Sequence, residues 1–239
     1  MQLCDLTLGT PEENLACDEA LLDYCEGGDS DELLRLWAPL EYFVVLGYAN
    51  KAATEVNLAL CRILNIPVRR RCTGGGTVLQ GPGVLNYSLI LRTDDSGPFH
   101  SIAATNKFIL ERHRDALANL VLAPVEWRGQ TDLAIGGLKC AGNAQRRRRR
   151  FLLFHGSFLL HLDLELLQKV LPQPSQQPDY RLNRAHSEFL VNLNLPNHTL
   201  KTALSRAWNA TVPLDPIPLD QITSLAREKY ALDEWNLKF

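Results

Sequence analysis

The 239-residue sequence has no apolar stretch long enough to span a membrane, and its N-terminus, MQLCDLTLGTPEEN, lacks the basic-then-apolar pattern of a signal peptide. It also has little net charge, because 25 Lys and Arg residues nearly balance 27 Asp and Glu residues. No general positive field is therefore present to attract nucleic acid. We expect a cytoplasmic protein with no membrane partner and no nucleic-acid partner.

The six cysteines form no C-x-x-C pair and no Cys/His spacing typical of a metal site. We predict reduced thiols that mostly pack in the interior, without a disulfide framework. The chain is 46% hydrophobic and shows neither an internal repeat nor a linker between two cores. We expect a single domain over residues 1–239.

Helix signals occur near both ends of the chain. Thr10 and Glu13 form a capping box with Pro11 at the first helical position, which predicts a helix that ends near Glu26, before Gly27 and Gly28. Further helices are predicted at 54–64, capped by Thr54, and at 100–120, 199–209 and 219–230.

Short β-branched, apolar or aromatic runs predict the strands. We expect 33–37 and 42–47 to form a pair, and further strands at 67–71 and 85–91, near Val125, Leu133 and Leu138, and at 151–160. Residues 172–178, rich in Pro and Gln, should be a loop. Helices around mostly hairpin-connected strands give an α+β fold with a mixed, largely antiparallel sheet.

The segment RRRCTGGGTVLQGPGVLNYSLIL, residues 69–91, places three glycines between a basic strand end and an apolar strand. Without a Cβ, Gly74, Gly75 and Gly76 can adopt positive φ and let a ligand lie against their N–H groups. The flanking residues favour a ligand with an anionic head and an apolar tail. A glycine-rich turn without a ligand is the alternative interpretation.

This loop, together with TDLAIGGLKCAGNAQ and LLFHGSFLL, resembles the lipoate-protein ligases, whose motifs are RR-x-[ST]-GGG, K-x-x-G-x-A and H-G-[ST]-x-L-L. RLWAPLEYFVVLGYANKAATEVN is similar to the family's first strand pair, and PDYRLNRAHSEFLVNL to its later loop and helix start. The resemblance covers nearly the whole chain. It implies the biotin/lipoate protein ligase fold, which is class II synthetase-like.

The resemblance also implies a two-step reaction. Lipoate or octanoate and ATP, with Mg²⁺, form an acyl-adenylate, and a lysine of an acceptor protein then attacks it; the acceptor is a lipoyl domain or a glycine-cleavage H-like protein. Lys139 matches the family's catalytic lysine, which contacts both the acid's carboxylate and the α-phosphate. A fixed cation there stabilises the charge that develops as the carboxylate attacks phosphorus.

Other positions match the family's substrate and adenylate contacts: Arg70, Arg71, Thr73, Gly74, Gly75, Gly76, Thr77, Asn86, Gly142, Ala144 and His155. Asp132 occupies the family's N-D-L position and is a candidate Mg²⁺ or nucleotide contact, with a turn carboxylate as the alternative. His155 has the alternative interpretation of a buried structural histidine.

The sequence departs from the family at two places. Gln80 stands where many members have histidine, and the chain ends soon after Trp235, so we expect no C-terminal accessory domain in it. A separate accessory subunit, a self-sufficient ligase and a protein that performs only transfer all stay open. A catalytically silent lipoyl-binding protein is a further alternative, whereas biotin ligases are disfavoured because their loop alternates glycine with arginine.

The enzymatic rival is an octanoyl- or lipoyl-transferase that uses a cysteine thioester. One transferase group has a late cysteine, but Cys140 is the last here; the other has one in the loop before the lysine strand, and 124–131 contains none. Only Cys72 lies beside the glycine loop. The run of five arginines at 146–150 is either a mobile solvated stretch or a contact for pyrophosphate or an acidic acceptor; nucleic-acid binding is disfavoured because no aromatic residues interleave with it.

Overall fold

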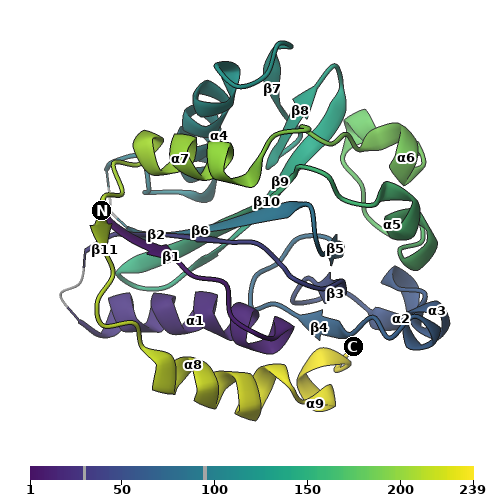
Figure 1. The fold of residues 1–239 in the computed structure, drawn as a ribbon, viewed down its shortest axis with the longest axis horizontal. Coiled ribbons are helices and arrows are strands. Elements are labelled where there is room, and N and C mark those ends of the chain that lie inside the picture. The colour runs from purple at the N-terminus through teal and green to yellow at the C-terminus, as the bar shows by residue number, and fades with distance from the viewer. Residues whose placement is uncertain (29–30, 94–95) are drawn as a thin grey trace.

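The computed structural model describes residues 1–28, 31–93 and 96–239, and its main feature is an eight-stranded sheet (Figure 1). Its strands are β1 (Gln2–Asp5), β2 (Leu33–Trp37), β6 (Val84–Arg92), β7 (Val125–Arg128), β8 (Asp132–Ile135), β9 (Leu138–Arg147), β10 (Phe151–Leu159) and β11 (Val212–Pro213). They lie in the order β11-β1-β2-β6-β10-β9-β8-β7. The first three are parallel and all later neighbours are antiparallel, which confirms the predicted mixed, largely antiparallel sheet.

A second, three-stranded sheet carries the glycine loop. In it β3 (Phe43–Leu46) lies between β4 (Val68–Arg70), which is parallel to it, and β5 (Val78–Gln80), which is antiparallel. The loop connects β4 to β5, so its two ends are fixed by strands that both pair with β3. The small sheet thus determines where the glycines meet the large sheet.

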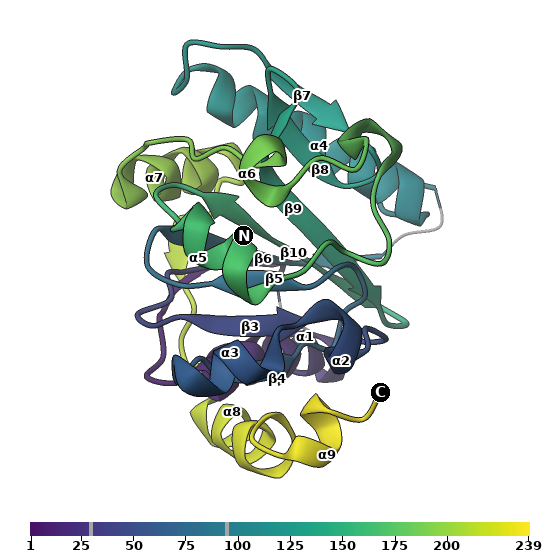
Figure 2. The same ribbon diagram turned by 90° about the vertical axis from the view of Figure 1, so that its right-hand side faces the viewer.

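Helices cover both faces of the large sheet. They are α1 (Pro11–Gly27), α2 (Ala52–Glu55), α3 (Leu58–Ile63), α4 (Ile102–Ala118), α5 (Leu164–Val170), α6 (His186–Phe189), α7 (Asn197–Ala207), α8 (Leu219–Leu225) and α9 (Asp233–Asn236), with short turns η1 (Asp179–Arg181) and η2 (Ala226–Tyr230). α1 and α8 lie on one face and α4 and α7 on the other, and each layer encloses its own apolar core (Figure 1). In the turned view, α2 and α3 lie beside the small sheet (Figure 2).

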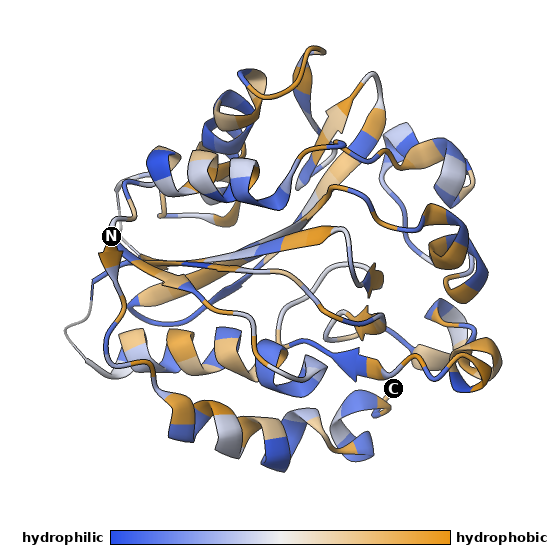
Figure 3. Ribbon diagram, viewed as in Figure 1, coloured by the Kyte–Doolittle hydropathy of each residue, from blue (hydrophilic) through white to orange (hydrophobic). Residues whose placement is uncertain are grey.

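Helix α1 begins as the sequence predicts. The Thr10 hydroxyl accepts from the Glu13 N–H at 3.2 Å, and the Glu13 carboxylate accepts from the Thr10 N–H at 3.1 Å. Hydrophilic and hydrophobic residues alternate along the covering helices (Figure 3). α1 is nevertheless buried on most sides, because it lies between the sheet and α8. That position encloses two acidic residues, Asp18 and Glu19.

Two predictions of local structure were wrong. β2 and β3 do not pair: β2 has β1 and β6 as neighbours, so no edge is left for β3, which starts the second sheet. The predicted helix 54–64 is two short helices, and Asn57, not Thr54, caps the second by accepting from the Leu60 N–H. β1 and β5 were not predicted. No helix in the part of the chain that the structure describes is both long and apolar enough to cross a membrane.

His113 provides a test of the core between α4, α7 and the sheet. It is fully buried and accepts a 2.8 Å hydrogen bond from the Trp208 indole N–H. Burial lowers its pKa from 6.5 to about 3. In the unfolded chain, His113 binds a proton near pH 6.5, whereas the buried imidazole of the folded protein stays neutral at that pH. The free energy of unfolding therefore falls as the pH falls below 6.5.

We expect His113→Gln, which retains an acceptor for Trp208, to remove this pH dependence. Between pH 7 and pH 5 the free energy of unfolding of the wild type should fall about 2 kcal/mol more than that of the variant. Urea unfolding at the two pH values measures this difference. Equal losses in both proteins would contradict the assignment of a neutral buried imidazole.

Candidate active site

The face of the large sheet that is covered by α1 carries a row of polar and small residues. His155 of β10 lies opposite Ala144 of β9, and Ser157 lies opposite Gly142. Because alternate residues of a strand share a face, Gly142 and Ala144 point to the same side as His155. The small side chains on β9 leave space above this part of the sheet.

A β-bulge turns Lys139 toward the same face. Leu133 pairs with Ala141 and Ala134 pairs with Lys139, so Cys140 is an extra residue in β9. Cys140 and Ala141 both enter the core on the other face, and the alternation is reset at Lys139. The Lys139 side chain therefore lies over Gly142, where a Cβ would be only 2.7 Å from Cε and Nζ.

Asp132 holds the Lys139 ammonium, with 2.8 Å between Oδ1 and Nζ. The side chain of Lys139 is 26% exposed and that of Asp132 9% exposed, so the pair lies at the edge of the interior. The other carboxylate oxygen, Oδ2, accepts a 2.8 Å hydrogen bond from the Tyr180 hydroxyl. Two residues predicted separately as the catalytic lysine and the candidate metal ligand thus form one ion pair.

Tyr180 was not predicted as a site residue. It lies in η1, and its ring packs against Phe189 and beside Gly129, whose φ of +56° favours glycine. Burial, together with the nearby Asp132 carboxylate, raises the pKa of its hydroxyl, which therefore keeps its proton for this bond. The sequence indicated Tyr180 only by its place in the segment PDYRLN, and no motif spacing relates that segment to Asp132.

The glycine loop is exposed and is shaped from within by Arg71. The Arg71 guanidinium donates to the carbonyls of Gly74 at 2.6 Å and Gly76 at 2.7 Å, and through Nε to the Thr73 hydroxyl at 3.0 Å. Burial lowers its pKa from 12.5 to about 10, so the group remains a cation at pH 7. Gly75 has a φ of +87°, where an L side chain would be strained, and its missing Cβ leaves room for this guanidinium.

The loop and the lysine strand meet directly. A Cβ on Gly75 would lie 3.5 Å from the Ala144 Cβ, and Ala144 is two residues along β9 from Gly142. Two residues on one strand span about 7 Å, so the bend and the Lys139 ammonium share one face at short range. The structure therefore brings the glycine loop and Lys139 together on one face of the sheet.

Two predicted contacts, Arg70 and Thr77, lie outside this cluster, and a third, Asn86, lies at its buried side next to Ser157. Arg70 is fully buried and donates to the carbonyls of Gly47, Tyr48, Asn50, Trp235 and Asn236. The Thr77 hydroxyl donates to the Asn50 side chain at 3.2 Å. Asn86 is closed in a triad with Gln80 and Ser157. Arg70 therefore anchors β4, the strand before the loop, to α9. Asn86 is held in the interior by its hydrogen bonds to Gln80 and Ser157.

Thr73 and His155 are neighbours within the cluster, with 2.7 Å between the Thr73 hydroxyl and His155 Nε2. The other ring nitrogen, Nδ1, lies 2.8 Å from Asp18 Oδ2 in α1. His155 therefore has a hydrogen-bond partner on each side of its ring.

Four arginines of the run 146–150 contact residues of the same chain in this structure. Arg146 and Arg148 pair with the α1 residues Glu19 and Asp23 at 2.8 and 2.9 Å, and Arg150 donates to the Glu26 carbonyl at 2.7 Å. Arg147 donates to the Phe99 carbonyl. The run ties the end of β9 and the following turn to neighbouring helices and loops.

All six cysteines are described by the structure, and all are buried and unbridged. Burial raises the pKa of the Cys72 thiol, which packs in the core under α1. Burial raises that of Cys140 to about 12, and this side chain enters the opposite core. Neither thiol is exposed on the face that carries Lys139.

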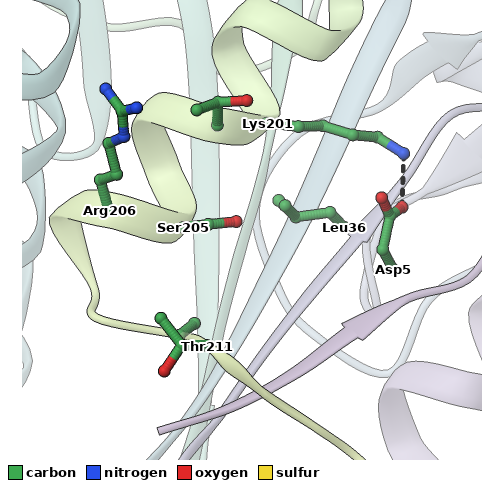
Figure 4. A pocket seen from close by; sticks show the side chains of 8 residues that line it. Asp5, Leu36, Lys201, Ser205, Arg206 and Thr211 are labelled. Atoms are coloured by element: carbon green, nitrogen blue, oxygen red, sulfur yellow. Dashed lines mark hydrogen bonds and ion pairs between the residues drawn. The ribbon is translucent and has the colours of Figure 1, made fainter.

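A shallow cavity of about 260 Å³ lies away from this cluster, beside α7. Its lining includes Asp5, Leu36, Lys201 and Arg206, and Lys201 pairs with Asp5 across it (Figure 4). None of the predicted site residues lines it. The cavity therefore belongs to another part of the surface.

The family model of the lipoyl protein ligase A/B catalytic domain matches residues 10–196. The chain belongs to this family. Among curated proteins, this chain is 31% identical to lipoate-protein ligase A subunit 1 of Thermoplasma acidophilum, with 97% of this chain and 94% of the relative covered. It is 28% identical to the octanoyltransferase LipM of Brevibacillus brevis, with 96% and 95% covered.

Solved structures agree with this membership. A lipoate protein ligase structure from T. acidophilum with bound lipoic acid matches with a TM-score of 0.81 at 26% identity, covering 100% of this chain and 99% of that one. A bi-partite lipoate protein ligase of T. acidophilum, studied with its E2 lipoyl domain, matches with a TM-score of 0.81 at 27% identity over 99% and 95%. A lipoate-protein ligase A bound with ATP matches with a TM-score of 0.80 at 29% identity over 99% and 98%. The fold implied by the sequence resemblance is confirmed.

Gly142→Ala tests the placement of Lys139. The added methyl would displace Cε and Nζ, which end a flexible side chain, so the fold should tolerate the change while the ammonium leaves Asp132. We expect a small loss of thermal stability, because Asp132 loses the ammonium but keeps its hydrogen bond from Tyr180, and a loss of about 10²-fold in the rate of acyl transfer. Gly27→Ala is the control, because a methyl there meets no atom within 4 Å. Full activity in Gly142→Ala would show that the position of Lys139 is not critical.

Proposed function

We propose that this protein activates lipoate or octanoate with ATP to the acyl-adenylate and transfers the acyl group to a lysine of a lipoyl-acceptor protein. The observation that carries the proposal is the Lys139 ammonium, held by Asp132 above Gly142 on the face that the glycine loop approaches. A cation and a set of exposed backbone N–H groups at one place suit two anions that must react with each other.

Lys139 supplies the mobile cation of this site. Its ammonium can leave Asp132 and contact both the acid's carboxylate and the α-phosphate, while Tyr180 continues to donate to the aspartate. The charge that develops on the phosphate oxygens is then stabilised by a group already oriented toward the reacting atoms. The protein forms no covalent intermediate on this route.

The glycine loop supplies the fixed part of the site. The Arg71 guanidinium is committed to the carbonyls of Gly74 and Gly76, which turns those carbonyls inward. Arg71 therefore shapes the loop and contributes positive potential beneath it, while the loop N–H groups receive the anionic end of the ligand. Its buried charge lies a short distance behind the surface where the anion binds.

ATP is the cosubstrate of this proposal, and Mg²⁺ would accompany it. Asp132 is a single carboxylate whose two oxygens already have partners, and the described residues hold no group of three His, Cys, Asp or Glu arranged for a metal. Mg²⁺ bound mainly through phosphates and water requires only one or two protein carboxylates. Asp132 would hold it only together with the nucleotide phosphates, where the ion would neutralise their charge.

The six buried cysteines support the ligase over the thioester transferase. A nucleophilic thiol must reach the substrate as thiolate, and Cys72 and Cys140 have raised pKa values in the two cores. The second candidate function is ATP-independent octanoyl transfer, favoured by the similarity to LipM along the chain. A silent lipoyl-binding protein is the third.

The bi-partite T. acidophilum ligase and its E2 lipoyl domain suggest partners for this chain. We propose that the acceptor is a lipoyl domain or an H-like protein, and that a separate accessory subunit assists adenylation. Adding such a subunit should accelerate acyl-adenylate formation more than the transfer step.

The proposed function predicts ATP-dependent acylation. The protein is incubated with ATP, Mg²⁺, lipoate or octanoate and an apo lipoyl domain, with and without an accessory subunit, and the acceptor is analysed by mass spectrometry. A parallel reaction contains octanoyl-acyl carrier protein and no ATP. Acylation only with ATP and free acid supports the ligase. Acylation only from the carrier protein shows that the protein is a transferase. Tight lipoate binding without acylation from either donor supports the silent lipoyl-binding protein.

Lys139→Ala should lower the rate of acyl transfer by about 10²-fold or more, because the charge on the reacting phosphate loses its stabilising cation. Lys169→Ala is the matched control, since Lys169 is an exposed lysine of α5. Rates of acceptor acylation under saturating ATP compare the three proteins. Equal rates in Lys139→Ala and wild type would refute the proposed role of the ammonium.

A further inference from the structure

A continuous series of hydrogen bonds connects the buried centre of the sheet to the glycine loop. Arg35 of β2 donates to Asp18 Oδ1 at 2.7 Å, and Asp18 Oδ2 lies 2.8 Å from His155 Nδ1. His155 Nε2 lies 2.7 Å from the Thr73 hydroxyl, which accepts a 3.0 Å bond from Arg71. Arg71 then donates to the loop carbonyls. The series runs from β2 through α1 and β10 to Thr73 and Arg71, which follow β4 and begin the loop segment.

Asp18 is the fixed end of this series. It is 3% exposed, and Oδ1 also accepts from the Ser88 hydroxyl at 2.8 Å. Burial alone would raise the pKa of this carboxyl, but the His155, Arg35 and Ser88 contacts together lower it. Asp18 is therefore a carboxylate that can only accept hydrogen bonds. Arg35 is itself held by the carbonyl and side chain of Asn14 at 2.8 Å each.

The direction of every bond follows from that carboxylate. His155 Nδ1 must be the donor to Asp18, which leaves Nε2 of a neutral ring as an acceptor. Because that Nε2 carries no hydrogen, Thr73 donates its hydroxyl hydrogen to it, while the Thr73 oxygen accepts the Arg71 N–H. The Thr73 oxygen is thus oriented toward Arg71, and Arg71 is oriented toward the carbonyls of Gly74 and Gly76.

We propose that Asp18 is a positioning residue of the site, which acts through His155 and Thr73 to hold the glycine loop in its ligand-ready shape. This inference rests on the proposed function. It gives His155 a role behind the loop, orienting Thr73, where the sequence resemblance implied a direct contact with substrate. Asp18 needs no contact with the ligand, because its effect passes entirely through the order of hydrogen bonds.

A double-mutant cycle tests this route. Asp18→Asn can no longer impose the donor role on His155, and Thr73→Val removes the hydroxyl that receives the effect. We expect each change to raise KM for lipoate in acceptor acylation about 10-fold, and Asp18→Asn to add nothing in a Thr73→Val background. Thr73→Ser, which keeps the hydroxyl, should restore the wild-type KM.

Two further measurements, loop NMR signals and urea unfolding, separate an effect on the loop from a loss of folding. The backbone N–H signals of Gly74 to Gly76 in ¹H–¹⁵N spectra report the loop without any activity, and Asp18→Asn should shift them only when Thr73 is present. Asp23→Asn is the matched control on α1, because its contact with Arg148 is partly exposed. Urea unfolding verifies that each variant folds. If Asp18→Asn does not fold, His155→Asn, which keeps a donor to Asp18 but offers Thr73 no acceptor at the Nε2 position, replaces it in the cycle.

The outcomes separate the two proposals. Independent, multiplicative effects of Asp18→Asn and Thr73→Val in a wild type that acylates the acceptor would overturn the positioning role and leave the proposed function standing. Coupled shifts of the loop signals in a protein that acylates nothing would support the positioning role and reject the proposed function. Unchanged KM and unchanged loop signals in Asp18→Asn would also overturn the inference.

Discussion

The close approach of the glycine loop to its surroundings is the constraint on which the site depends. The Gly75 carbonyl lies where a side chain on Gly47 would begin, at 2.0 Å from an added Cβ, and Gly75 itself lies against Ala144. Gly142 leaves equivalent space for the end of Lys139. A side chain on Gly47 would push the loop away from the turn, and one on Gly142 would displace the end of Lys139. The ammonium and the loop N–H groups would then no longer share one binding face.

Buried charges surround this junction, and each one is satisfied by several partners. Arg70 and Arg71 donate to backbone carbonyls, Asp18 and Arg35 form a pair, and Glu19 accepts from Arg146, Lys229 and Tyr230. An unpaired charge in such a position would be strongly destabilising. The protein therefore maintains a polar frame beneath an exposed loop, which suits the proposed site, where two anions would be placed together.

Local signals in the sequence predicted the elements well and their partners less well. The capping box at Thr10, the periodicity of 100–120 and the strand runs all correspond to observed elements, because they depend on neighbours in the chain. The predicted pairing of β2 with β3 was wrong. The edge of β2 is instead occupied by β1, a four-residue strand with little sequence signal of its own. The extra residue in β9 that aims Lys139 has no sequence mark, because a bulge is defined by the partner strand.

The sequence by itself determined the family and the predominantly antiparallel α+β fold, and it predicted that the lysine and the glycine loop form one site. Tertiary structure decided which of three successive arginines shapes the loop, that Asp132 holds Lys139, and that Tyr180 and Asp18 support them. The reason is physical: motifs record the backbone conformations and residue types that a site requires. The hydrogen-bond partner of a buried charge comes from whichever distant segment the fold brings within 3 Å, as α1 does for His155.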